Sequence, residues 1–530
     1  MRPSIFNDVL GPVMRGPSSS HTAASWRIGR TAVALLGEPP VRALVEFDEE
    51  GGWAPNYEDQ GTVIGMDGGL LGVDITDERI IDTSGIARER GVVIEYAVSR
   101  FPTDHPNTVR LTLEGASGAS LRLVAVSTGG GMFVIRTVDG QPVTIEGDWH
   151  DLLAIAARTP TPAERDAFER ALPAGCRVEW TDGRAHVRSA TPFAEDLVGR
   201  LRAAPSSGPS FAPWIAVVRT SPPVLPIPSG AEREIPYDSA ASMLAYAERT
   251  GRSLGSVGIE YEALRSGLSE AQVAERMESL ISIIERSIAT GLAGTHYDDR
   301  ILGQQSHLVG QAERAGRIPP DPILNALVAN IAAIMEAKSA MQVIVAAPTA
   351  GGCGTLGGTI KAVADHVGTD RETLRRAYFA AGMIGVWFAA GPGFSAEAGG
   401  CQLETGAAAS MAAAALVELH GGTAREAIAA ASMALQNTIG LVCDPVADRV
   451  EVPCLGKNVA AGANARTASI MALSGFDPVV PLDEVIETVK SVAASMPRSL
   501  CCTGLGGLAA TSTAHALKQE LAVRKACARC

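Results

Sequence analysis

Three cysteines in the C-terminal third of the chain stand at similar breaks in a helical pattern. Cys401 lies in AGGCQLETG, Cys443 in GLVCDPVAD and Cys454 in VEVPCLGKN, each close to glycine or proline. Helix ends and loops between packed helices suit metal ligands, because backbone N–H groups can bond there to cluster sulfurs. Three thiolates suit a [4Fe–4S] cluster with one iron left open, whereas structural zinc prefers four closed ligands, usually in CxxC pairs. Buried structural thiols are the alternative that composition leaves open.

The chain also ends on a cysteine, Cys530, in the sequence CARC. A thiol at a chain end is usually a liability, so we interpret it as a tether, a redox handle or a removable metal ligand. Cys527 and Cys530 form the only CxxC pair of the sequence, and one such pair is a weak indication of zinc. The chain has nine cysteines, an odd number, and its N-terminus has no secretory pattern, so we do not expect a disulfide framework.

A second group of reactive side chains lies near the N-terminus, in GPSSSHT at residues 16–22. Hydroxyls, a histidine and the N–H groups of a loop can converge there on one anion such as a carboxylate. The alternative is a serine-rich turn that caps the helix expected from about Ala23. His105, in HPNT, is a further candidate. The glycine-rich PTAGGCGTLGG (348–358) lacks the GK[ST] ending of a phosphate loop, and its glycines instead allow backbone to approach a ligand closely.

Two α/β regions precede the cysteines. Residues 1–149 contain valine-rich alternating runs, such as VRALVEFD and TVRLTLEG, and a helix in RIGRTAVALLG, and this pattern predicts an α/β domain. Residues 150–230 predict a small α/β module with a linker. We expect helices in DWHDLLAIAA, AERDAFERAL and AEDLVGRLR, a hairpin with Asp-Gly at its turn in CRVEWTDGRAHVRSA, and a strand in WIAVVRT. SSGPS and the proline-rich SPPVLPIPSGAE are typical of linkers.

Residues 238–530 predict an all-α domain. Ser269 followed by Gln272 forms a capping box at the start of the long run SEAQVAERMESLISIIERSIATGL. Alanine- and glycine-rich runs such as GCQLETGAAASMAAAALVEL predict helices that pack closely inside a bundle. The fold class we expect is therefore multidomain, with an N-terminal α/β domain, a small α/β module and a C-terminal all-α domain that carries the clustered cysteines.

The bulk composition fits an enzyme or binding protein. The chain has 530 residues, 46% of them apolar, which is more than one core usefully holds, so we expect two or three domains. The net charge of −13 is spread along the chain and argues against nucleic acid or an anionic membrane as the main partner. The N-terminus has no apolar signal region, and the most apolar stretch, residues 407–419, is too short to span a bilayer. We expect a cytoplasmic protein.

Several of these stretches together resemble the iron–sulfur L-serine dehydratases (L-serine ammonia-lyases). They are GPSSSHT (16–22), HPNT (105–108), GGG (129–131), APTAGGCG (347–354), GGCQLETGAAASMAAA (399–414), CDPV (443–446), EVPC (451–454) and GLGGLA (504–509). Their order matches a chain in which the β and α parts of that family are fused. The middle module corresponds to the region where some relatives carry an ACT-like regulatory module.

The resemblance implies a cofactor and a set of site residues. It implies that Cys401, Cys443 and Cys454 hold a [4Fe–4S] cluster, and that a C-terminal cysteine, Cys530 rather than Cys527, caps the open iron until substrate displaces it. An open iron acts as a Lewis acid on a β-hydroxyl while a base takes the α-proton, which converts L-serine into pyruvate and ammonia. Alanine-rich packing and an ACT-like module also favour a homodimer. The substrate contacts implied are Ser18, Ser19, Ser20, His21 and Thr22, with His105 nearby.

The sequence departs from the family pattern at several substrate-side positions. The stretch YEDQGTV (57–63) corresponds to KGHGTD in typical relatives. Gln60 therefore stands in place of the histidine, and Val63 stands in place of the aspartate. Lys338 replaces an asparagine that usually precedes the PTAG segment. Cys501 and Cys502 stand where an arginine–glutamate pair is common. The cluster cysteines match the family pattern, whereas several residues expected near the substrate do not. This combination suggests the same elimination reaction on a different substrate.

The leading hypothesis is an iron–sulfur hydro-lyase that acts on L-serine. The runner-up is a dehydratase of a dicarboxylic β-hydroxy acid such as 2-(hydroxymethyl)glutarate, in which Lys338 pairs with the additional carboxylate, unless Lys338 is an exposed helix lysine. A non-catalytic iron–sulfur sensor needs the same cysteines but not the PSSSHT loop. A small-molecule binding protein with structural thiols needs no metal.

Overall fold

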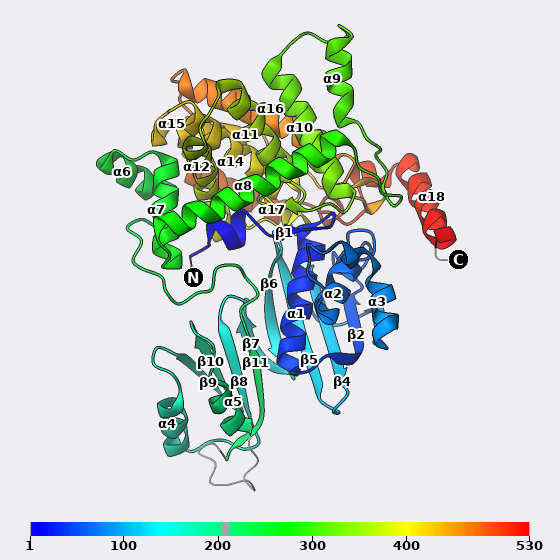
Figure 1. The fold of residues 1–530 in the computed structure, drawn as a ribbon, viewed down its shortest axis with the longest axis vertical. Coiled ribbons are helices and arrows are strands. Elements are labelled where there is room, and N and C mark those ends of the chain that lie inside the picture. The colour runs from blue at the N-terminus through cyan, green and yellow to red at the C-terminus, as the bar shows by residue number, and fades with distance from the viewer. Residues whose placement is uncertain (1, 203–212, 529–530) are drawn as a thin grey trace.

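The computed structural model describes residues 2–202 and 213–528, and of residues 525–528 only the backbone. Figure 1 shows a helical body, an α/β part below it and a small α/β module beside that part. The predicted combination of α/β structure in the N-terminal region with helices in the C-terminal region is confirmed. Among the described residues, no helix combines the length and the apolar character needed to cross a membrane.

A six-stranded sheet forms the N-terminal α/β part, in the order β3-β2-β4-β5-β6-β7. The alternation that predicts it is seen in β5, where Leu121, Leu123 and Ala125 are buried in the core. Only β2 and β3 pair in parallel, and two helices connect them. The strands are β2 (Pro40–Asp48), β3 (Val93–Ser99), β4 (Thr108–Gly115), β5 (Ser120–Gly129), β6 (Met132–Val138) and β7 (Gln141–Ile145).

Three helices, α1 (Ala24–Leu36), α2 (Thr62–Leu71) and α3 (Thr83–Arg90), accompany this sheet (Figure 1). α1 and α2 pack with their backbones in close approach. A Cβ atom at Gly65 would lie 2.1 Å from the Thr22 carbonyl oxygen, so only glycine fits there. This contact holds the segment before α1, which carries the PSSSHT residues, firmly against α2.

The small module has the element order β8 (His150–Ala156), α4 (Pro162–Ala171), β9 (Arg177–Thr181), β10 (Arg184–Ser189), α5 (Glu195–Arg202), β11 (Ile215–Ser221). Its antiparallel sheet has the order β11-β8-β10-β9, which is a ferredoxin-like arrangement. The predicted Asp-Gly hairpin is confirmed as the turn between β9 and β10. Of the predicted linkers, SSGPS lies outside the described residues, and SPPVLPIPSGAE contains no regular element after β11.

The prediction of a helix in DWHDLLAIAA is wrong, because this stretch forms β8 in the middle of the module sheet. Leu152 and Ala154 pack under the module helices, while Leu153 packs into the core of the N-terminal sheet. A strand that is buried on both faces has an unbroken run of apolar residues in its sequence. Periodicity alone cannot distinguish such a run from a buried helix.

The helical body is built around α14, in which every residue is buried. Its alanines allow neighbouring helices to approach closely, as the composition predicts. The capping box of Ser269 and Gln272 at the start of α8 is confirmed. The helices are α6 (Ala240–Thr250), α7 (Leu254–Ser266), α8 (Glu270–Ala293), α9 (Ser306–Arg314), α10 (Pro322–Ser339), α11 (Cys353–Val367), α12 (Arg371–Ala390), α13 (Ala396–Gly399), α14 (Thr405–Leu419), α15 (Ala424–Gln436), α16 (Cys454–Leu473), α17 (Leu482–Ser495) and α18 (Ser512–Ala528).

The first residues of the chain belong by their contacts to the helical body and not to the α/β part that follows them. The π-helix η1 (Ile5–Val9) packs against α12, where Phe6 meets Phe379 edge to face. The short strand β1 (Val13–Met14) pairs with β12 (Ile344–Val345), just before the glycine-rich loop. This crossing ties the N-terminal PSSSHT segment to the helical body, which places both halves of the candidate site side by side.

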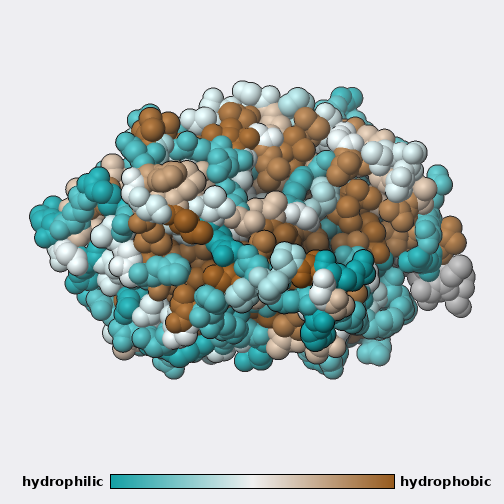
Figure 2. Space-filling view, turned by 90° about the horizontal axis from the view of Figure 1, so that it is seen from above, coloured by the Kyte–Doolittle hydropathy of each residue, from teal (hydrophilic) through white to brown (hydrophobic). Residues whose placement is uncertain are grey.

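The surface of the helical body carries apolar side chains. Seen from above, Figure 2 shows them gathered in bands between polar residues. The exposed large apolar residues of this body include Ile470, Phe476 and Val479, of which Val479 is 82% exposed.

Candidate functional site

The structure brings Cys401, Cys443 and Cys454 together inside the helical body. Cys401 begins the short 3-10 turn η5 (Cys401–Leu403), Cys443 lies in the loop after α15, and Cys454 is the first residue of α16. All three are buried. The thiol of Cys443 contacts that of Cys401, and Cys401 also interacts electrostatically with Cys454. Two helix starts and one loop therefore bring their sulfurs to one place.

The donor set at this place fits a metal centre. Donor atoms of Cys401, Glu404 and Cys443 all lie within 4.8 Å of one another. The contacts with neighbouring thiols, together with burial, raise the pKa of Cys443 well above its ordinary value, and burial raises the pKa of Cys454 strongly. Buried thiols packed this closely release their protons only when a cation compensates the charge, which is what metal binding supplies. Sequence reasoning did not select Glu404, whose pKa burial raises to about 7.

A lysine accompanies the sulfurs. Lys457 Nζ lies 4.0 Å from Cys401 Sγ and donates hydrogen bonds to the Val442 carbonyl at 2.7 Å and to Asp444 Oδ1 at 2.6 Å. Burial lowers the pKa of Lys457, but Cys401 and Asp444 raise it by more, so the net shift is upward. The ammonium therefore stays charged beside the thiols and offsets the negative charge that metal-bound sulfurs carry.

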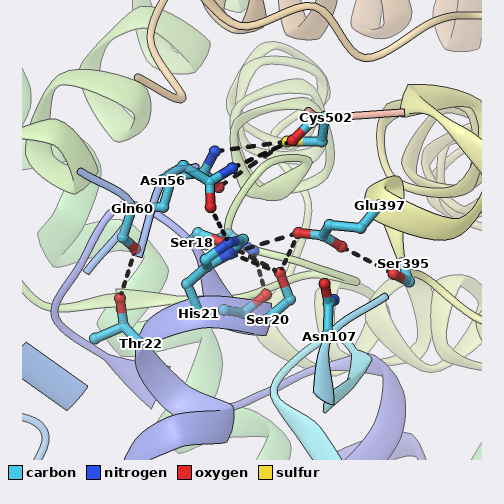
Figure 3. A network of polar contacts seen from close by, with 12 residues as sticks. Ser18, Ser20, His21, Thr22, Asn56, Gln60, Asn107, Ser395, Glu397 and Cys502 are labelled. Atoms are coloured by element: carbon cyan, nitrogen blue, oxygen red, sulfur yellow. Dashed lines mark hydrogen bonds and ion pairs between the residues drawn. The ribbon is translucent and has the colours of Figure 1, made fainter. Parts of the chain in front are cut away.

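The PSSSHT residues form a short π-helix, η2 (Ser19–Ala23), directly before α1. His21 is fully buried there, and its Nδ1 lies 2.9 Å from Ser18 Oγ and 3.1 Å from Ser20 Oγ. Its Nε2 lies 3.0 Å from Asn56 Oδ1 (Figure 3). The Asn56 amide donates from Nδ2 to the Cys502 carbonyl, which turns Oδ1 toward the histidine. Nε2 therefore carries the imidazole proton, and Nδ1 accepts a hydrogen bond from Ser18, with Ser20 beside it.

A buried carboxylate, Glu397, completes this network. Ser20 Oγ donates to Glu397 Oε1 at 2.8 Å, Ser395 Oγ donates to Oε2 at 2.8 Å, and His21 Nδ1 lies 3.4 Å from Oε1 (Figure 3). Burial raises the pKa of Glu397, but the positive charge of a protonated His21 and the hydrogen bonds from Ser20 and Ser395 lower it by more. Burial lowers the pKa of His21, and Glu397 offsets only part of that shift. The pKa values of both groups are therefore lowered, and the carboxyl and the imidazole titrate as one buried acid–base pair.

Asn107 also points into this network (Figure 3). It is fully buried, yet neither its Oδ1 nor its Nδ2 has a hydrogen-bond partner among the described residues. A buried amide without partners is costly unless a ligand or water supplies them. Sequence reasoning selected His105 from the HPNT motif and missed Asn107. A Cβ atom at Gly52 would lie 2.9 Å from Asn107 Oδ1 and 3.4 Å from Glu397 Cβ, so Gly52 leaves room for both side chains.

We call the thiols Cys401, Cys443 and Cys454 the sulfur half of the site. We call Ser18, Ser20, His21, Asn56 and Glu397 the hydroxyl half. The two halves are adjacent in the chain at one point, because Glu397 in α13 precedes Cys401 by four residues. That spacing, in GFSAEAGGC, is the sequence signal for Glu397, and it was not used. Nothing in the sequence singled out Asn56.

The other predicted site residues lie around these halves. Ser19 Oγ accepts a hydrogen bond from the Ala350 N–H in the glycine-rich loop, and Thr22 Oγ1 donates to the Gln60 carbonyl. His105 is half-buried, and its Nδ1 accepts from the Asn107 N–H at 3.1 Å. Cys530 lies outside the described residues, as does the side chain of Cys527.

Lys338 is fully buried in α10, so the alternative of an exposed helix lysine is wrong. Its Nζ donates a hydrogen bond to the Val450 carbonyl at 2.6 Å. Its charge lowers the pKa of Glu404 and of Cys454, so it lies within electrostatic reach of the sulfur half. The ammonium thus already compensates buried acidic groups of the protein itself.

The chain is similar to known proteins over most of its length. The pattern of the family described as "Serine dehydratase alpha chain" matches residues 235–509. A "Probable L-serine dehydratase, alpha chain" from Bacillus subtilis is 38% identical over 253 residues, which are 48% of this chain and 84% of that protein. The "L-serine dehydratase, alpha chain" of Peptoniphilus asaccharolyticus is 30% identical over 284 residues, 53% of this chain and 97% of that protein.

A second kind of relative also matches the chain. A "Probable L-serine dehydratase, beta chain" from Bacillus subtilis is 41% identical over 152 residues, which are 29% of this chain and 67% of that protein. The chain is therefore similar both to proteins named as alpha chains and to one named as a beta chain.

Proposed function

The chain belongs to the serine dehydratase family, and on that premise we propose that it converts L-serine into pyruvate and ammonia. The observation that carries the choice of substrate is the ionised, buried Glu397 beside the hydroxyls of Ser18 and Ser20. L-serine presents both an ammonium and a carboxylate. Glu397 complements the ammonium, whereas hydroxyls and loop N–H groups complement the carboxylate.

We assign a [4Fe–4S] cluster to the sulfur half. The support is the chemistry of the donor set, three buried thiols from two helix starts and one loop, with Lys457 beside them. The cluster, when bound, supplies a Lewis-acidic iron for the β-hydroxyl of the substrate. Glu404, whose carboxylate shares the donor group with Cys401 and Cys443, faces the same place and can accept a proton there.

The hydroxyl half orients the substrate and moves its proton. Ser18 and Ser20 face His21 Nδ1, so a ligand that replaces them at this nitrogen meets a neutral imidazole able to accept a proton. Asn56 holds the opposite nitrogen as a donor and thereby keeps Nδ1 free of a proton. Asn107 supplies an amide whose hydrogen bonds a bound substrate can complete. The dense packing of buried residues around His21 excludes bulk water from this step.

The dicarboxylic substrate is the weaker candidate. Lys338, the residue that suggested it, donates to a backbone carbonyl and lies near Glu404 and Cys454, so its charge is used within the protein. A second substrate carboxylate in place of the ammonium would lie against Glu397 and be repelled by it.

The direct test supplies L-serine to protein reconstituted anaerobically with iron and sulfide. We expect release of pyruvate and ammonia in equal amounts. Absence of pyruvate from L-serine, together with a new alkene signal from 2-(hydroxymethyl)glutarate, would transfer the proposal to the dicarboxylic substrate. The His21→Ala variant separates an enzyme from a sensor, because it should lose turnover and keep its iron.

Two features of the assembly are also proposed. The ferredoxin-like strand order of the middle module supports an ACT-like regulatory role for residues 150–230. Measuring the melting temperature in the presence of single amino acids would test this role, because a bound ligand raises it.

The apolar residues Phe476 and Val479 on the helical body support a homodimer. Sedimentation of the full chain would distinguish a dimer from a monomer.

A further inference from the structure

We propose that Cys502 is a fourth thiol of the metal centre and that it occupies the position a substrate takes when it binds. The inference rests on the proposed function, since it requires the cluster at Cys401, Cys443 and Cys454. It concerns a residue at which this sequence departs from the family, where an arginine–glutamate pair is common.

The first support is the position of Cys502 among the other sulfurs. Cys502 is buried in one apolar cluster with Cys401, Cys443 and Ala396, and its thiol contacts the Cys443 thiol. Two backbone hydrogen bonds hold it there. The Cys443 N–H donates to the Leu500 carbonyl at 2.8 Å, and the Cys502 N–H donates to the Cys443 carbonyl at 2.9 Å. The segment that carries Cys502 is thus aligned on a ligand loop by its own backbone.

The second support is the backbone conformation of Cys502. Its φ is +58°, in the left-handed region that residues with a side chain rarely adopt. Glycine would adopt this conformation without cost, and the chain places glycine at the nearby Gly504, which also has a positive φ. The backbone at Cys502 is therefore strained, and strain of this kind is concentrated at functional sites.

The third support is that Cys502 joins the two halves of the site. Gln60 Nε2 donates to Cys502 Sγ at 3.6 Å, and Asn56 Nδ2 donates to the Cys502 carbonyl at 3.2 Å (Figure 3). Gln60 is itself a departure from the family pattern, so two altered residues meet here. Through Asn56, which contacts both His21 and the Cys502 carbonyl, the Cys502 thiol lies between the hydroxyl half and the sulfur half, the position in which a bound substrate would replace it.

Cys501 offers a matched control. It is adjacent in the chain and equally buried, at 3% exposed, and its backbone forms a bridge with Cys443. Among the contacts of the described residues, none joins its thiol to that of Cys401 or Cys443. A Cys501→Ser variant therefore makes the same chemical change at the same segment without removing a donor. The competing fourth ligand is Cys530, which a Cys530→Ser variant tests in parallel.

The experiment is ⁵⁷Fe Mössbauer spectroscopy of the full chain reconstituted anaerobically with iron and sulfide. In the unmodified protein we expect every iron to have an isomer shift typical of coordination by four sulfurs. In Cys502→Ser and in Cys502→Ala, the isomer shift of one iron of the cluster should increase. Addition of L-serine to the unmodified protein should move the same iron. Cys501→Ser and Cys530→Ser should match the unmodified spectrum. Far-UV circular dichroism of each variant shows that it has folded.

Each other outcome overturns the proposal. A distinct iron already present in the unmodified, substrate-free protein would show that no fourth thiol binds. A shifted iron in Cys530→Ser, with an unchanged Cys502→Ser spectrum, would assign the position to the terminal cysteine. Either result leaves the proposed function intact, whereas a failure of the unmodified chain to bind iron and sulfide would remove both.

Discussion

The two halves of the site are built in different ways. The sulfur half uses residues from two helix starts and one loop, whose positions depend on the packing of the whole helical body. The hydroxyl half uses mainly one short π-helix, held against α2 by glycine contacts, with Glu397 reaching it from the helical body. The sulfur half is therefore suited to hold a cofactor that needs several fixed donors, and the hydroxyl half to orient a small ligand by hydrogen bonds.

This difference predicts that damage to one half leaves the other intact. Loss of a sulfur should remove the cofactor together with activity. Loss of a hydroxyl-half side chain should reduce turnover or substrate affinity while the cofactor stays bound. The predictions below use this separation.

The largest effect is expected from Cys443→Ala. Loss of a ligand at the centre of the thiol group should remove most of the iron and lower kcat by at least about 10³-fold, because Lewis-acid catalysis contributes several kcal/mol. Iron and labile sulfide analysis with a pyruvate assay measures both. Cys176→Ser, at a half-buried thiol of the middle module, is the control and should change neither. Normal iron content in Cys443→Ala would contradict the assignment of the sulfur half.

His21→Ala should lower kcat by about 10²- to 10⁴-fold, the range that a positioned proton acceptor contributes. Iron content and the visible absorption of the cluster should stay at the level of the unmodified protein, since His21 contacts none of the three thiols in the described contacts. Concurrent loss of iron would show that the two halves are not separable in the way proposed.

Glu397→Gln should raise the KM for L-serine by about 10- to 100-fold, because it replaces a charged partner of the substrate ammonium with a neutral amide. The effect on kcat should be smaller. Ser395→Ala, which removes only one hydrogen bond to Glu397, should have a weaker effect in the same direction. Steady-state kinetics of the anaerobic proteins measures this, and an unchanged KM in Glu397→Gln would exclude its contact with the ammonium.

Asn107→Ala should raise KM by about tenfold, the cost of a lost hydrogen bond to a ligand. The thermal stability of the substrate-free protein should not fall, because the amide has no hydrogen-bond partner in the described part of the chain. The neighbouring His105→Ala, at a half-buried histidine, is the control. A large drop in melting temperature without a change in KM would show that Asn107 is only structural.

The smallest effect concerns Asp67 of α2, the helix that supports the hydroxyl half. Burial raises the pKa of Asp67 to about 6, although Tyr96 and Thr83 hydrogen-bond to it. The folded protein therefore keeps a proton that the unfolded chain releases, and stability falls as pH rises from about 4 to 6, by roughly 2 kcal/mol. Asp67→Asn should flatten this dependence in thermal melts, and an unchanged slope would contradict the shift.

Local patterns in the sequence predict much of this fold. The valine alternation of β5, the Asp-Gly hairpin of the module and the capping box at Ser269 are each confirmed, because each depends on residues a few positions apart. The helix predicted over β8 failed because burial on both faces of a central strand depends on partners far along the chain. Family membership also came from short motifs and is confirmed by the matched family pattern.

The site itself could be predicted only in part. The PSSSHT residues and the cysteines were found because their types suggest chemistry. Glu397 was missed although it lies only four residues before Cys401, and Asn107 was missed because a lone amide has no signal until the fold buries it. Gln60 and Cys502 were noticed as departures, but their contact depends on residues more than 400 positions apart in the chain.

The central claim is that the two halves form one iron-dependent site for L-serine. The most direct measurement is pyruvate release from L-serine by a single anaerobic preparation before iron removal with a chelator, after removal, and after reconstitution with iron and sulfide. The account predicts that activity disappears with the iron and returns with it. Pyruvate release at an unchanged rate from the iron-free protein would contradict it.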